Sequence, residues 1–320
     1  MLALASLADP VPVRRLFTNQ PEQRRALTLE ALAAAGVPVL RVATTDSSAL
    51  DEACRLGVLA PELLELLRTA HADWAADDQA DEFFRSQETE PGDAQSGLVP
   101  YFFVRSRPAP TDDLYRRLSW HATDFASPLF AHTASALEAD AAVMRHAATL
   151  ACEQPSRRCL YALTTQPGHH ASRERYGGYC FVNWAVLLVK LLEQAGRTPF
   201  VLDVDYHAGD GTAAMLGAEG MVSLHCADDY PYISAAEPWA VALPPQTDWA
   251  GYEPHLREAL DTRLPEGCDV LVVSLGADTL AGDPDRCVSF CFKFKLSTLR
   301  MSFAPLNTAV YCLPPVELRD

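Results

Sequence analysis

The chain has 320 residues, of which 49% are hydrophobic and 21% are charged, a balance that suits one large α/β domain or two small ones. Its formal net charge of -16 at pH 7 argues against nucleic acid as a direct partner and favours the approach of a cationic substrate or a basic protein tail. Nine scattered cysteines, a start too short for a signal peptide and no stretch long enough to span a bilayer predict a cytoplasmic protein with reduced thiols.

Helices and strands alternate along the chain. The first predicted elements are a helix at 21–35, begun by Pro21 and ended by Gly36, and a strand at 37–42, so the chain is expected to open with a helix. Further helices are predicted at 61–74, 135–153, 183–194 and 254–264, and further strands at 159–163, around Val201, Leu202 and Val204, at 221–225 and at 269–275. This alternation predicts a single α/β domain over residues 1–320, with a central parallel sheet flanked by helices on both faces.

Two segments interrupt that pattern. Residues 77–100, acidic and polar up to Gly97, are predicted to form a surface insertion. Residues 285–320 form a divergent C-terminal segment in which the run 308–313 is the nearest candidate for a strand.

Polar side chains gather where the strand around Val201 ends. Asp203, Asp205, His207 and Asp210 follow this apolar run, although burying unpaired charge is costly. A cation would compensate that cost, and ligands bind at the carboxyl ends of strands in open α/β sheets. Asp205 and His207 are two residues apart, so in an extended chain they point the same way toward one metal ion.

The strand at 269–275 supplies a third metal ligand. Asp278 follows this strand and is the obvious partner for Asp205 and His207. Two carboxylates and one imidazole leave coordination positions open, as a catalytic rather than a structural zinc site requires.

Tandem histidines follow the strand at 159–163. Pro167 and Gly168 predict a tight turn that presents His169 and His170, which are too close in sequence to ligate the same ion without strain. They are better placed as proton-transfer groups, each oriented by one of the remaining carboxylates, Asp203 and Asp210.

Four motifs carry a resemblance to a known family. They are Pro167-Gly-His-His-Ala171, Gly177-Gly-Tyr-Cys-Phe-Val-Asn183, Asp203-Val-Asp-Tyr-His207 and Ser274-Leu-Gly-Ala-Asp278. Together they resemble the zinc-dependent histone deacetylase superfamily. The tyrosine at 206 and the run Ala277-Asp-Thr-Leu-Ala-Gly-Asp-Pro284 look most like its bacterial acetylpolyamine amidohydrolase branch. The resemblance implies the arginase–deacetylase fold and removal of acetyl from an acetylpolyamine or an acetyl-lysine.

The resemblance also implies roles for individual residues. By position, Asp205, His207 and Asp278 would hold one Zn²⁺, and His169 with Asp203 and His170 with Asp210 would move protons between the attacking water and the leaving amine. Gly178 would offer its carbonyl to the substrate amide and Tyr179 would line an aromatic tunnel. Tyr230 or Tyr232 would supply the opposite wall, and Tyr232 is the predicted substrate-binding residue of the two.

Two further implications concern an ion and a partner chain. A structural K⁺ is expected near Asp203, Asp205 and His207, with oxygens from Ser223 and Leu224. The acidic insertion stands where the polyamine branch carries a dimer-forming loop, which implies a homodimer.

Three departures from the family pattern stand out. Ala208 replaces a second histidine, Trp184 follows Asn183 where a small or polar residue is usual, and no Glu-Gly-Gly-Tyr motif occurs. The tyrosine of that motif donates a hydrogen bond to the developing oxyanion, and loss of one such donor costs about 10² to 10³ in rate. The sequence therefore predicts weak activity, and a frameshift after Pro284 is an alternative explanation of the altered end.

Three other interpretations stay open. An arginase-like enzyme would need further carboxylates beside Asp278, but position 276 is Gly. A protein that keeps the zinc pocket only to bind acetylated amines fits the absent tyrosine, whereas the intact histidines argue against it. The altered end would also destabilise the fold if it failed to cover apolar surface.

Overall fold

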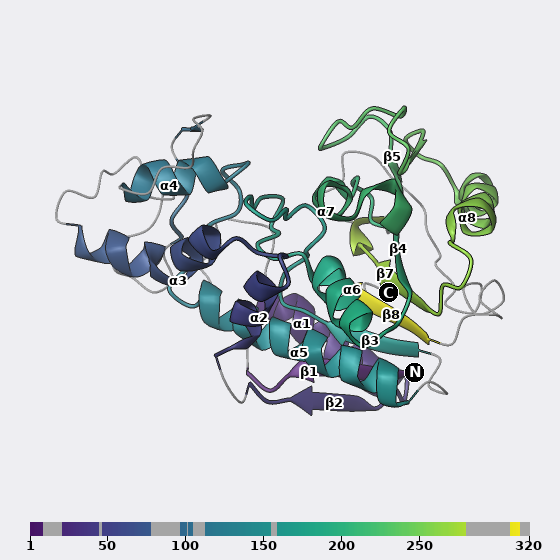
Figure 1. Cartoon of the computed structure of the whole chain (residues 1–320), viewed down its shortest axis with the longest axis horizontal. Coiled ribbons are helices and arrows are strands. Elements are labelled where there is room, and N and C mark those ends of the chain that lie inside the picture. The colour runs from purple at the N-terminus through teal and green to yellow at the C-terminus, as the bar shows by residue number, and fades with distance from the viewer. Residues whose placement is uncertain are drawn as a thin grey trace.

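The computed structural model describes residues 1–8, 21–44, 47–77, 97–100, 102–104, 113–154, 159–279 and 308–313. Its described strands form one parallel sheet in the order β2-β1-β3-β8-β7-β4-β5-β6 (Figure 1). The strands are β1 (Leu2–Ser6), β2 (Val39–Val42), β3 (Cys159–Leu163), β4 (Pro199–Asp203), β5 (Met221–Cys226), β6 (Ala240–Leu243), β7 (Val270–Ser274) and β8 (Thr308–Leu313). The predicted parallel sheet is confirmed.

Helices cover both faces of this sheet. They are α1 (Pro21–Ala34), α2 (Ala49–Arg55), α3 (Pro61–Ala76), α4 (Leu114–His121), α5 (Thr133–Glu153), α6 (Trp184–Gln194), α7 (Asp210–Gly220) and α8 (Trp249–Arg263). Helices α5 and α6 cross one face, and α3 and α4 lie farther out, at the left of Figure 1.

The side chains of each strand alternate between two apolar cores. Val201 of β4 packs into the core under α5, α6 and α7, whereas Phe200 and Leu202 pack into the core under α8, which also receives Leu29 and Leu32 of α1. Because both faces are covered, the strands read as continuous apolar runs rather than alternating ones. The apolar runs of the strands therefore did not indicate which of their residues face which core.

Two predictions about the elements were wrong. The chain opens with a strand, since β1 precedes α1 and pairs in parallel with β2 and β3. Helix α8 begins at Trp249 rather than at Pro254, because the Asp248 carboxylate accepts a 2.9 Å hydrogen bond from the amide of Gly251 and caps the helix there. Sequence patterns also missed α2, α4, β6 and α7, and of these α7 matters most because it begins at Asp210.

The predicted C-terminal strand is confirmed, and its position is central. Strand β8 lies between β3 and β7, with Leu163 opposite Leu313 and Ser274 opposite Cys312. The rest of residues 285–320 and residues 78–96 of the predicted insertion lie outside the described residues. No helix among the described residues is both long and apolar enough to cross a membrane.

Candidate metal centre and active site

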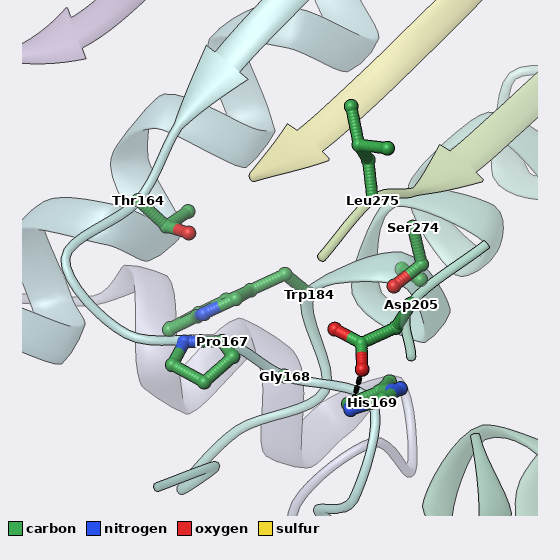
Figure 2. A pocket seen from close by; sticks show the side chains of 9 residues that line it. Thr164, Pro167, Gly168, His169, Trp184, Asp205, Ser274 and Leu275 are labelled. Atoms are coloured by element: carbon green, nitrogen blue, oxygen red, sulfur yellow. Dashed lines mark ion pairs between the residues drawn. The ribbon is translucent and has the colours of Figure 1, made fainter. Parts of the chain in front are cut away.

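The three polar strand ends meet at one edge of the sheet. Strands β4 and β7 are neighbours with Asp203 opposite Ser274, and β3 is separated from β7 only by β8. The loops that follow β3, β4 and β7 therefore leave the same edge of the sheet, and Figure 2 shows Asp205 between His169 and Ser274, the last residue of β7. This is the edge at which ligands bind in α/β sheets.

Asp205, His207 and Asp278 form a compact cluster there. One ligand atom from each lies within 4.8 Å of the others, and among the described residues this is the one such group that could hold a metal ion. His207 Nδ1 lies 2.9 Å from Asp278 Oδ2 and 3.3 Å from Asp205 Oδ1. The structure thus brings together the three residues assigned as ligands.

The electrostatics of the cluster favour a cation. Burial raises the pKa of Asp278 to about 6, and the neighbouring Asp205 carboxylate adds to the rise. Burial would lower the pKa of His207, but hydrogen bonds and charges from Asp205 and Asp278 outweigh it and raise the pKa to about 11. The two carboxylates thus stabilise a positive charge on the neighbouring imidazole, and the same charges would attract a metal cation.

The residues present fit a zinc ion. Two carboxylates and one imidazole are hard and borderline donors that zinc accepts, and three protein ligands leave a position open for catalysis. Gly276 makes the arrangement sterically feasible, because a Cβ atom there would overlap the carboxylates of both Asp205 and Asp278. Sequence reasoning did not assign Gly276 a part in the site.

His169 is buried between two carboxylates. Its Nδ1 lies 3.0 Å from Asp203 Oδ2, and its Nε2 lies 3.6 Å from Asp205 Oδ1. Burial would lower the pKa of His169, but the charges of Asp205 and Asp203 and the hydrogen bond to Asp203 raise it to about 9. The predicted pairing of His169 with Asp203 is present.

His170 is paired with Asp210, as predicted. The Nδ1–Oδ1 distance is 2.7 Å, and the ring centroids of His170 lie 4.0 Å from His169 and 5.9 Å from His207. Burial lowers the pKa of His170 to about 4, and the charge of His169 lowers it further. The two histidines thus have carboxylate partners of their own but opposite pKa shifts.

The start of α7 fixes the histidine turn. The amide of Thr212 donates a 3.0 Å hydrogen bond to the carbonyl of His169, and Gly211 leaves no room for a Cβ atom against His170. Asn183 links the same elements, because its Nδ2 donates to the carbonyl of Ala171 and to Thr212 Oγ1, each at 3.0 Å. Asn183 appeared in a family motif, but its cross-linking role was missed because Thr212 is 29 residues away.

Trp184 supports the turn from the interior. It is 1% exposed, and its Nε1 donates a 3.0 Å hydrogen bond to the carbonyl of Gln166. With Pro167, Gly168 and His169 it lines the small pocket of Figure 2. Trp184, one of the three departures from the family pattern, therefore supports the loop that carries the histidines from the start of α6.

Gly178 and Tyr179 belong to a tight turn beside His170. Both have positive φ, 55° and 61°, which is unfavourable for Tyr179 by about 1–2 kcal/mol. Gly178 is packed so closely on His170 that a Cβ atom would collide with its ring. The structure thus places Gly178 against the predicted proton-transfer group, with Tyr179 as the next residue of the turn.

Of the two candidate tyrosines for the opposite wall, Tyr230 is the one that lies beside the histidines. The Tyr230 ring centroid lies 4.9 Å from that of His170 and 6.4 Å from that of His207. Burial raises the pKa of Tyr230 to about 12, and the Asp210 carboxylate contributes to the rise. Tyr232, in contrast, is 75% exposed, and the structure does not bring it to the cluster.

Ser223 and Leu224 lie on β5, the strand next to β4. Ser223 stands opposite Asp203 in the sheet, and its Oγ accepts a 3.3 Å hydrogen bond from the amide of Gly209. Leu224 is buried. Their predicted role as potassium ligands stays a prediction.

Comparison with known proteins identifies the family. The sequence pattern described as "Histone deacetylase domain" matches residues 20–304. The chain belongs to the histone deacetylase family. This confirms the resemblance drawn from the motifs.

Individual histone deacetylase relatives point to one branch. Acetylpolyamine amidohydrolase 1 of Pseudomonas aeruginosa is 30% identical over 69% of this chain and 65% of its own, and Acetylpolyamine amidohydrolase 2 of the same organism is 29% identical over 56% and 57%. The chain thus spans about three fifths of the length of these relatives.

The fold is shared with a solved structure. The crystal structure of acetylpolyamine aminohydrolase from Burkholderia pseudomallei matches with a TM-score of 0.76 at 22% identity, over 98% of this chain and 93% of that chain. The predicted deacetylase fold is therefore confirmed.

Proposed function

We propose that the protein is a zinc-dependent amidohydrolase that removes acetyl from an acetylated amine. The observation that carries the proposal is the cluster of Asp205, His207 and Asp278 beside two histidines, each paired with its own carboxylate. Membership of the histone deacetylase family supports the same chemistry.

Asp205, His207 and Asp278 would hold the zinc ion. When bound, zinc would supply Lewis-acid polarisation of the acetyl carbonyl and would lower the pKa of a water molecule. The close approach of two carboxylates and an imidazole, with room provided by Gly276, supports this assignment.

His169 and His170 would move the protons. Each has Nδ1 on a carboxylate, so each presents Nε2 for proton transfer, and the carboxylate fixes the orientation of the ring. Between them they would take a proton from water as its oxygen bonds to the carbonyl carbon. They would return one to the amine nitrogen as the C–N bond breaks, leaving acetate and a free amine.

The walls would select a thin substrate stem. The Tyr230 ring and the backbone of Gly178 both lie against His170, Tyr179 would line the passage beside them, and the Gly178 carbonyl is the candidate acceptor for the substrate amide N–H. The net charge of -16 and the names of the relatives favour an acetylpolyamine, with acetyl-lysine as the second candidate.

We propose that turnover by this chain is slow. Its 320 residues contain no Glu-Gly-Gly-Tyr motif, and a missing oxyanion donor costs about 10² to 10³ in rate. The absence of this donor is also the one observation that favours the alternative, a protein that binds acetylated amines without turning them over. An arginase-like dimetal site fits poorly, because Gly276 has no room for a further side chain.

Acetate release tests the proposal. Zinc-loaded protein is incubated with N-acetylputrescine, an acetyl-lysine peptide or arginine, and acetate and urea are quantified. We expect acetate from at least one acetylated amine and no urea. Binding of N-acetylputrescine by folded, zinc-loaded protein without acetate release would instead support the binding-protein alternative.

Tyr230 and Tyr232 lie in the same loop, so their substitution provides a matched test of which tyrosine lines the substrate site. Tyr230→Ala is expected to lower kcat/KM by about tenfold or more, because aromatic contact with the stem is lost. Tyr232→Ala should leave kcat/KM within about twofold, because this side chain is 75% exposed. The reverse order of effects would restore Tyr232 as the wall residue.

The structural potassium, the homodimer, the cytoplasmic location and the single-domain organisation remain predictions. Nucleic acid and membrane are not among the proposed partners.

A further inference from the structure

The wall beside His170 is a two-residue turn with an unusual backbone. Gly177 and Cys180 exchange both hydrogen bonds of a tight hairpin, at 3.0 and 2.9 Å. The two central residues, Gly178 and Tyr179, both have positive φ, as in a type I′ turn. Tyrosine is poorly suited to such a position, so interactions outside the turn must hold it.

Those interactions come from a loop more than 50 residues earlier in the chain. The amides of the two central residues point out of the hairpin, where Asp124 Oδ2 accepts from Gly178 and Ser127 Oγ accepts from Tyr179 at 2.9 Å. Ser127 Oγ in turn donates to Asp124 Oδ2 at 3.1 Å. Both outward amides of the turn are thus bound by one linked pair of side chains.

This acceptor pair is itself fixed. Ser127 is fully buried, and Asp124 Oδ1 accepts a 2.8 Å hydrogen bond from the amide of Ala126. The amide of Thr123 also donates at 2.9 Å to the carbonyl of Tyr176, so the two loops run side by side up to the turn. A buried, fully engaged hydroxyl leaves the turn little freedom to shift.

We propose that Asp124 and Ser127 are positioning residues that hold the Gly178–Tyr179 turn, and with it one wall of the substrate site, against His170. The inference deepens the proposed function and rests on it for the identity of the substrate. The pair touches neither the histidines nor the metal cluster through any hydrogen bond described for it, so it acts through the turn.

Substitution of Asp124 or Ser127 should affect substrate binding more than the chemical step. Loss of either acceptor would free the carbonyl of Gly178 and the ring of Tyr179, which in the proposed function would contact the substrate stem, but would leave the cluster of Asp205, His207 and Asp278 in place. A change of this kind raises KM more than it lowers kcat.

The test combines hydrogen exchange with kinetics in the full chain. Ser127→Ala and Asp124→Asn are compared with Ser135→Ala and Asp113→Asn, matched changes at an exposed serine and at the carboxylate that caps α4. Exchange is followed by mass spectrometry in the peptide 176–181, and KM and kcat are measured with N-acetylputrescine on zinc-loaded protein.

We expect both test variants to speed exchange in peptide 176–181 by about tenfold, the effect of losing one hydrogen bond, with peptides of α6 and β4 unchanged. KM should rise about fivefold or more while kcat stays within about twofold, and the double variant should be no worse than the more affected single one, because the pair acts as one unit. The control variants should match the wild type.

Unchanged exchange in peptide 176–181 of Ser127→Ala would overturn the inference, as would a loss confined to kcat. Uniformly faster exchange across the chain would also overturn it, because that marks a general loss of stability. Absence of turnover in the wild type would contradict the proposed function alone, since the exchange comparison needs no activity.

Discussion

Asp278→Ala is expected to abolish both zinc binding and acetate release. Asp278 supplies one of three atoms within 4.8 Å of one another, and its removal leaves only Asp205 and His207. Loss of groups that merely orient ligands already costs 10- to 100-fold in metal affinity, so loss of a ligand should cost at least about a hundredfold. Zinc content after dialysis and acetate release measure the two effects.

A thermal shift separates metal loss from unfolding. Zinc should raise the melting temperature of the wild type, because it binds the folded cluster, but not that of Asp278→Ala. Asp228→Ala, at an exposed aspartate in the loop after β5, is the matched control and should retain zinc and turnover. Stoichiometric zinc of unchanged affinity in Asp278→Ala would remove Asp278 from the ligand set.

His170→Ala is expected to lower kcat by about 10² to 10⁴ while zinc stays bound, and His169→Ala should fall in the same range. Both rings are held by carboxylates at 2.7 and 3.0 Å, so each variant removes an oriented proton-transfer group. His255→Ala, at an exposed position of α8, should leave kcat within about twofold.

The zinc content of the histidine variants distinguishes a metal ligand from a proton-transfer group. If His170→Ala or His169→Ala lost zinc together with activity, that histidine would be a ligand and the assignment of Asp278 would need revision. If either variant kept full activity, proton transfer would have to come from another group. Circular dichroism spectra matching the wild type would exclude unfolding as the cause of a loss.

Much of the candidate site could be predicted from the sequence, because the site residues directly follow apolar strands. Asp205, His207 and Asp278 were assigned from positions just after β4 and β7, and the parallel sheet brings such positions together. The strand positions indicated only that Asp203 and Asp210 were available to orient the histidines, and the family resemblance implied the pairing of His169 with Asp203 and of His170 with Asp210.

Contacts between distant loops could not be read in this way. Nothing in the local sequence of Asp124 or Ser127 indicates that they bind the amides of Gly178 and Tyr179, since side chain-to-backbone bonds over this separation leave no periodic signal. The sequence could not distinguish Tyr230 from Tyr232 for a related reason, because both follow the same strand and only the loop conformation brings one ring beside His170 and leaves the other exposed.

Two elements of the sheet were also beyond local patterns. Strand β1 is a short apolar run at the start of the chain, and its pairing with β2 and β3 depends on segments as distant as Leu160. Strand β8 was predicted as a strand, but only the fold places it between β3 and β7, beside the site.

Zinc K-edge X-ray absorption of the zinc-loaded wild type tests the central claim most directly. Two carboxylates and one imidazole predict a first shell of nitrogen and oxygen alone at about 2.0 to 2.2 Å, and this shell should be lost in Asp278→Ala. Sulfur scattering at about 2.3 Å would show that cysteines hold the zinc elsewhere in the chain and would contradict the proposed centre.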